Sequence, residues 1–129
     1  MKKLLLLLFS LLISFNSYGF FHKTVCVETD AQERGGIIYL PNETKPFTGK
    51  NLCKYENGQN KSEGKVKDGK LRVDGKWTNW YESGQIRAEG YHNNGMRDGK
   101  WTAWYENGQI EAELNFKDGV CISDCDYFK

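Results

Sequence analysis

Several features are scarce in this sequence of 129 residues, and each scarcity argues against a class of function. Basic and acidic residues nearly balance, at 18 and 17, so the chain has no basic excess with which to bind nucleic acid. There are two histidines, His22 and His92, and neither recurs at an equivalent position. We expect both to be solvated or otherwise satisfied surface side chains, which leaves little material for acid–base catalysis.

Helical periodicity and phosphate-binding loops are missing as well. No repeat unit places its apolar residues at the 3.6-residue spacing of an amphipathic helix, and a glycine arrives every few residues. The glycines separate short strand-like segments and none precedes a helical pattern, which argues against a phosphate loop. The sequence therefore predicts no catalytic residues, no cofactor and no metal site.

Internal repetition is the dominant feature of the chain. The segment Asp74–Arg97 is copied at Asp98–Gly119, so that Trp77 aligns with Trp101 at an offset of 24 residues. A weaker copy lies upstream at an offset of 26, and its two additional residues fall within Leu71–Val73. A fixed period of this size is typical of repeat arrays, in which each unit stacks on its neighbours to bury its apolar face.

Each repeat has the pattern of a β-hairpin. Residues Gly99–Tyr105 are rich in aromatic and other strand-favouring residues, and Ile110–Phe116 alternates apolar and polar residues. Between them, Asn107-Gly108 predicts a type I′ turn, in which both central residues have positive φ. Asp118-Gly119 then turns the chain again.

Carboxylates recur with the same period. Glu63, Glu89 and Glu113 occupy one position of successive repeats. An acid–base pair is needed only once in a protein, so a recurring carboxylate indicates a solvated face or turn chemistry. We expect no enzyme activity.

Residues 1–19 have the pattern of a secretory signal peptide. Lys2 and Lys3 precede an apolar stretch of 12 residues, Leu4–Phe15, and Ser17-Tyr18-Gly19 offers small residues at a cleavage site. The apolar stretch is short for a membrane span, although an uncleaved N-terminal anchor is the alternative. We expect the mature protein to be exported, to the periplasm or to the extracellular space.

The four cysteines predict two disulfides in an oxidising compartment. Three pairings are open, and loop length favours Cys26–Cys53 together with Cys121–Cys125. A metal site is the alternative at the second pair, with Asp124 and Asp126 as further ligands. This site would lack paired cysteine spacing and a nearby histidine.

The chain divides into four predicted segments. Residues 1–19 are the signal peptide, 20–45 hold N-terminal strands, 46–119 form the repeat array, and 120–129 form a C-terminal cap with a cysteine pair. In the second segment, strands are predicted at Thr24–Thr29 and Ile37–Leu40, with a polar loop at Asp30–Gly36. The last segment is expected to cover the open edge of the sheet.

A family resemblance is carried by Pro46-Phe47-Thr48-Gly49, Tyr55-Glu56-Asn57-Gly58-Gln59, Asp98-Gly99-Lys100-Trp101 and Tyr105-Glu106-Asn107-Gly108-Gln109. In these residues the chain resembles the MORN-repeat variant proteins, which include bacterial YwqK-type antitoxins. The resemblance implies an all-β fold: an elongated, single-sheet array of antiparallel β-hairpins built from about three repeats of 24–26 residues. It also implies a binding scaffold without catalytic residues.

Aromatic residues are expected on both faces of such a sheet, because alternate strand residues point to opposite sides. The first row is expected to join neighbouring hairpins through cross-strand pairs. The second row is harder to bury in a single layer and is a candidate binding stripe. The candidate partner-binding residues are Trp77, Tyr81, Trp101 and Tyr105 in the first row and Trp80 and Trp104 in the second.

Two functions fit these features. The first is an exported, non-catalytic scaffold that binds an unidentified partner protein, such as a toxin or effector that it keeps inactive in the manner of an antitoxin or immunity protein. The second is a cell-envelope module that binds a glycan, a choline-like group or a lipid head group through its tryptophans. No nucleic-acid partner is expected with either.

Overall fold

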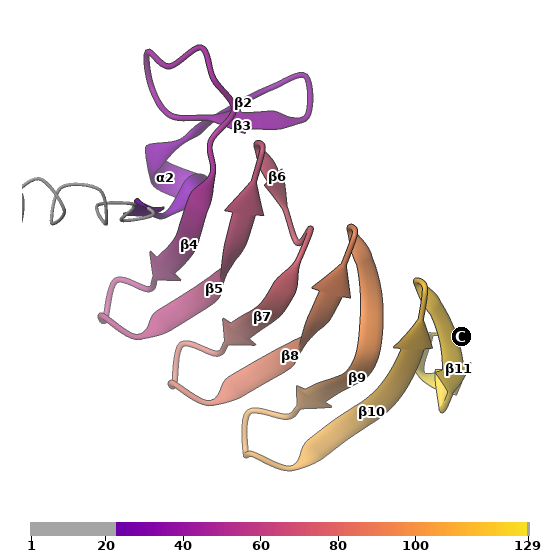
Figure 1. Cartoon of the computed structure of the whole chain (residues 1–129). Coiled ribbons are helices and arrows are strands. Elements are labelled where there is room, and N and C mark those ends of the chain that lie inside the picture. Colours follow the sequence, from indigo (N-terminus) through magenta and orange to yellow (C-terminus); the bar gives the residue numbers. More distant parts are fainter. Residues whose placement is uncertain (1–22, 129) are drawn as a thin grey trace, which may run out of the picture.

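The computed structural model describes residues 23–128, which form an open, twisted sheet of successive hairpins (Figure 1). Within these residues the main sheet has nine strands in the spatial order β1-β4-β5-β7-β8-β9-β10-β11, with β6 beside β5. Neighbouring strands pair antiparallel, except that β1 runs parallel to β4. The predicted all-β array of antiparallel hairpins is confirmed.

The strands of the main sheet are β1 (Thr24–Val25), β4 (Gly49–Lys54), β5 (Asn60–Lys67), β6 (Lys70–Leu71), β7 (Gly75–Trp80), β8 (Ile86–Asn93), β9 (Met96–Trp104), β10 (Ile110–Lys117) and β11 (Val120–Ser123). A short helix, α2 (Val27–Asp30), and a two-stranded sheet of β2 (Gln32–Arg34) and β3 (Ile37–Tyr39) precede the array, and a 3-10 turn (Cys125–Phe128) follows it. None of the helices among residues 23–128 is long and apolar enough to span a membrane. The predicted signal peptide, residues 1–19, lies outside the described residues.

The turns at the two ends of the hairpins differ in type. The type I′ prediction for Asn107-Gly108 is wrong, because only Gly108 has positive φ, at 89°. Instead, the carbonyl of Tyr105 accepts from the N–H of Gly108 at 2.9 Å, and the Tyr105 N–H donates to the carbonyl of Gln109 at 2.8 Å. This is a three-residue loop with its single left-handed residue last.

Turns with positive φ at both central residues lie at the opposite end of the strands, where one hairpin is connected to the next. Asp118 and Gly119 have φ of 51° and 81°, and Asn94 and Gly95 have 50° and 78°. Their backbone twist matches the right-handed twist of the flanking strands, which is why they connect hairpin to hairpin without splaying the sheet.

Hydrogen bonds join each repeat to the next at both ends. At the loop end, the Tyr55 hydroxyl donates to the carbonyl of Trp80 and the Tyr81 hydroxyl donates to the carbonyl of Trp104, both at 2.8 Å. At the turn end, the Gly95 N–H donates to the carbonyl of Val73 at 2.8 Å. The repeat is thus a unit of hydrogen bonding as well as of sequence.

The first repeat is covered by the N-terminal segment, where the apolar core is concentrated. Val25, Ile38, Phe47 and Val66 are buried together there. The strand predicted at Thr24–Thr29 is confirmed only for Thr24 and Val25, which form β1, and its remainder is wrong because α2 follows.

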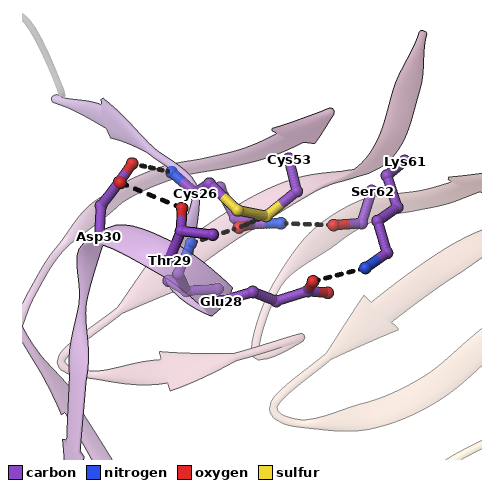
Figure 2. Close-up of a disulfide and its surroundings, with 9 residues drawn as sticks. Cys26, Glu28, Thr29, Asp30, Cys53, Lys61 and Ser62 are labelled. Atoms are coloured by element: carbon purple, nitrogen blue, oxygen red, sulfur yellow. Dashed lines mark hydrogen bonds and ion pairs between the residues drawn. A yellow bond between two sulfur atoms is a disulfide. The ribbon is translucent and has the colours of Figure 1, made fainter. Parts of the chain in front are cut away.

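Tertiary contacts account for that helix, as Figure 2 shows. Cys26 is held by the disulfide to Cys53, with Cα atoms 4.5 Å apart, and its N–H donates to the Asp30 carboxylate at 3.0 Å. The buried Asn51 accepts from the N–H of Val27 and donates to the Ser62 hydroxyl, both at 3.0 Å. Asn51 therefore occupies the position that a tryptophan occupies in the next two repeats, and it makes polar contacts with the N-terminal segment.

The last repeat ends differently. Strand β11 pairs with the final three residues of β10, Asn115 to Lys117, and the Cys121–Cys125 disulfide follows it. Both predicted disulfide pairings are confirmed, so these two sulfurs are bonded to each other and the alternative metal site at this pair is wrong.

Candidate functional site

The two faces of the sheet carry different side chains over strands β7 to β10. We call face A the side with Trp77, Asn79 and Trp101, and face B the side with Trp80 and Trp104. The N-terminal segment covers face A only at the first repeat, since α2 contacts β4. Over the second and third repeats, no element among residues 23–128 packs across either face.

Glycines determine how the face A tryptophans lie. A Cβ atom at Gly64 would meet the Trp77 ring at 2.0 Å, and one at Gly90 would meet the Trp101 ring at 2.1 Å. Each ring therefore lies directly on the backbone of the preceding strand, a position that only a residue without a Cβ atom permits. In the last repeat the equivalent residue is Leu114, which is buried and leaves no space for a further tryptophan.

The candidate aromatic residues differ in exposure. Trp77 is 4% exposed, whereas Tyr105 is 50% exposed. The other four, Trp80, Tyr81, Trp101 and Trp104, are partly buried.

Face B carries an apolar strip near the loop end of the hairpins. Trp80 is paired across the strands with Ile86, and Trp104 is paired with Ile110. Ile110 is 55% exposed although it is a large aliphatic residue. These four residues are the apolar strip, and the first repeat lacks it because Lys54 and Asn60 stand at the equivalent positions.

Beside the apolar strip, face B carries cross-strand ion pairs. A groove of about 900 Å³ runs over β4, β5, β7 and β8, and Trp80 and Ile86 of the strip contribute to its lining. Lys50–Glu63, Lys76–Glu89 and Lys100–Glu113 form ion pairs of 2.7, 3.1 and 2.9 Å at the same position of successive repeats. The recurring glutamates are thus cross-strand partners of recurring lysines on a solvated face, where such pairs contribute little to stability.

Face A holds a smaller groove of about 400 Å³ over β7 to β10. Trp77, Trp101 and three alanines contribute to its lining, with Leu114 at the C-terminal end. Its charged lining residues are three arginines and one acid: Arg72, Arg87, Arg97 and Glu111.

His92 lies in this groove and not at the surface, so the prediction of a solvated or satisfied histidine is wrong. Its side chain is 8% exposed, and its ring meets Trp101 edge-on with centroids 4.9 Å apart. Its Nδ1 atom has no hydrogen-bond partner among the described residues. Burial lowers the pKa of His92 below its usual range, and the charges of Arg72 and Arg97 lower it further.

Sequence reasoning missed this arginine and histidine group, although two signals were available. His92 follows Ala88 and Gly90 at alternate positions of one strand, which places all three on the same face. Arg72 lies within the two additional residues that separate the first repeat from the second. Neither signal indicates by itself that the side chains meet.

No group of three or more His, Cys, Asp or Glu side chains in the described part of the chain is placed to hold a metal ion. The ion-paired carboxylates of face B and the arginine-lined groove of face A can bind complementary groups. They do not form a nucleophile–base arrangement.

Residues 73–94 and 97–118 match the protein family described as MORN repeat variant. The two matches coincide with the β7–β8 and β9–β10 hairpins, so this part of the chain consists of two tandem repeats of that type. The β4–β5 hairpin lies outside the matches. No curated protein and no solved structure matches the chain significantly.

Proposed function

We propose that this chain is an exported, non-catalytic repeat scaffold that binds a partner protein through the apolar strip on face B. The observation that carries the proposal is the exposure of Ile110 beside the partly buried Trp80 and Trp104, on a face that no described element covers. Tryptophan is enriched among the residues that supply most of the binding energy at protein interfaces.

Export is supported by the two disulfides. Disulfides persist in oxidising compartments, and a thin sheet with a small core gains stability from them. The signal-like pattern of residues 1–19 agrees with a periplasmic or extracellular location.

A scaffold role is supported by the pairing of the recurring charges. The three glutamates that repeat along face B each bond a lysine of the same hairpin, as a structural ladder does. A toxin or effector protein is one partner class to test, and a glycan, choline-like or lipid head group is the competing ligand class.

The experiment is capture of the partner by the tagged protein in its source cells, followed by measurement of the purified pair by calorimetry. Trp80→Ala/Trp104→Ala is compared with Ile122→Ala, which removes an exposed aliphatic side chain outside the strip. We expect the double variant to weaken binding by about tenfold or more and Ile122→Ala to bind as the unaltered protein does.

A second variant tests the strip without removing a buried side chain, so it should not affect folding. Ile110→Lys places a charge on an exposed position of the strip and should keep the melting temperature while weakening binding. Full binding by Ile110→Lys and by the folded double variant would reject the strip as the interface. Retention of a glycan or lipid in place of any protein would favour the competing ligand class.

A further inference from the structure

The face A groove contains a buried polar atom without a partner. Among residues 23–128, the Nδ1 atom of His92 is the one buried side-chain nitrogen or oxygen that makes no hydrogen bond. Buried polar groups are nearly always hydrogen-bonded in folded proteins, and an exception requires an explanation. His92 lines the groove, so a ligand bound there can supply the missing contact.

Two arginines lie over the tryptophans on either side of this histidine. The guanidinium carbon of Arg72 is 4.9 Å from the centre of the Trp77 ring, and that of Arg97 is 4.9 Å from the centre of the Trp101 ring. The attraction between a cation and the face of an aromatic ring holds each guanidinium group near its tryptophan. Arg72, Arg97 and His92 all line this one groove, and the charges of both arginines act on the histidine.

The position of Arg72 depends on a departure from the repeat. The third repeat begins with one continuous strand, β9, directly after the turn. In the second repeat the equivalent strand is interrupted by two additional residues and forms β6 and β7. Arg72 lies in this division with φ of 58°, a left-handed conformation that non-glycine residues rarely adopt. Such conformations concentrate at binding sites, because the surrounding structure must enforce them.

We propose that the face A groove binds an acidic segment of a partner protein, with one carboxylate held by Arg72, Arg97 and His92. Guanidinium groups present paired N–H donors that match the two oxygens of a carboxylate. The Nδ1 atom of His92, when protonated, donates to the same group. This inference rests on the proposed protein-binding function and assigns it a second surface.

The lining of the groove favours a peptide over an anionic membrane or a polyphosphate. Ala88, Ala103 and Leu114 give the groove an apolar part that suits aliphatic side chains flanking the acid. Glu111, in the same groove, would repel a second negative charge. The volume of about 400 Å³ lies at the lower end of the range of ligand pockets and suits a few side chains.

The test uses an array of pentapeptides with a central Asp or Glu and varied flanking residues, each beside its Asn or Gln counterpart. The oxidised full chain is compared with Arg72→Gln, Arg97→Gln and Lys65→Gln. Lys65 is a cation that lines the groove on face B and serves as the matched control. Every variant is first checked for an unchanged thermal transition.

We expect the protein to retain some acidic peptides about tenfold better than their amide counterparts, and either arginine variant to remove that preference. Lys65→Gln should keep it. The NMR signals of the His92 ring should move on binding, with the pKa of His92 raised by the nearby carboxylate.

The proposal is overturned if no acidic peptide is preferred to its amide, or if folded Arg72→Gln and Arg97→Gln bind as the unaltered protein does. Preferential binding of inorganic pyrophosphate or of phosphatidylglycerol vesicles would also overturn it. Failure here with normal capture of the partner through the apolar strip would leave the proposed function standing. If acidic peptides are preferred but the strip variants bind the partner normally, the groove proposal would stand and the strip would be rejected as the interface.

Discussion

The hydrogen bonds between tyrosine hydroxyls and the carbonyls of the next repeat give the sharpest test of how the array is held together. Tyr81→Phe removes one oxygen and leaves the ring in place. The lost hydroxyl donates to the carbonyl of Trp104 at 2.8 Å in a partly buried setting. Such a bond contributes about 0.5–1.5 kcal/mol net. A loss of about 1 kcal/mol corresponds to a fall of roughly 4–8 °C in the melting temperature of a domain of this size.

The chain provides its own controls for this prediction. Tyr55 makes the same bond to Trp80 one repeat earlier, so Tyr55→Phe should cost about the same. Tyr105 occupies the equivalent position in the last repeat but is half exposed, and its hydroxyl makes no hydrogen bond within the described residues. Tyr105→Phe should therefore change the free energy of unfolding by less than about 0.5 kcal/mol.

Urea denaturation of the oxidised protein, followed by tryptophan fluorescence, measures these differences at a common slope. All three variants keep their rings, so changes in packing are matched. A loss for Tyr105→Phe equal to that for Tyr81→Phe would refute the reasoning, because the cost would then belong to the loop and not to the bond between repeats.

Three further predictions concern the core, the disulfides and pH. Gly90→Ala should cost about 1–3 kcal/mol in urea denaturation, because its Cβ atom would lie 2.1 Å from the Trp101 ring; a neutral result would place the ring elsewhere. Replacing the Cys26–Cys53 pair by serines opens a loop of 27 residues and should lower the free energy of unfolding by about 3.5 kcal/mol. Replacing the Cys121–Cys125 pair opens a loop of 4 residues and should lower it by about 2 kcal/mol. Equal losses would contradict the argument that the cost follows from loop entropy. The pKa of His92 is lowered in the folded state from 6.5, so the free energy of unfolding should fall as pH drops through the window below 6.5 and level off above it. His92→Gln should flatten that slope, and identical pH profiles would contradict its burial.

Much of the array follows from local sequence. Each repeat encodes its own strands by alternation and its own turns by glycine, so the period and the pairing of neighbours are readable without tertiary knowledge. The loop at Asn107-Gly108 shows the limit of this approach. The same dipeptide fits a two-residue type I′ turn and the last two positions of a three-residue loop, and only the register of the flanking strands distinguishes the two.

The parts that sequence reasoning missed depend on contacts between distant residues. Helix α2 forms where a strand was predicted, because Asn51 bonds its first N–H across 24 positions and the Cys26–Cys53 disulfide fixes its start. The strand at β3 was predicted, but its partner β2 was missed because Gln32–Arg34 was assigned to the polar loop, of which Gly35 and Gly36 alone form the turn. His92 was expected in water because nothing in the local sequence shows that Trp101 packs against it.

Departures from the repeat are where a unique site in this molecule has to be sought. Identical repeats would present identical surfaces, and a ligand specific for one place needs residues that occur once. Two departures close the array: Asn51 accepts the N-terminal segment, and Leu114 occupies the space of a further tryptophan. Two others are Arg72, in the two-residue insertion, and His92, which replaces the aliphatic Val66 of the first repeat. These two serve neither end of the array, yet both line the groove on face A. Neither residue is needed to cover an end of the array, so we explain their presence by ligand binding. Substitution of Arg72 tests this explanation directly.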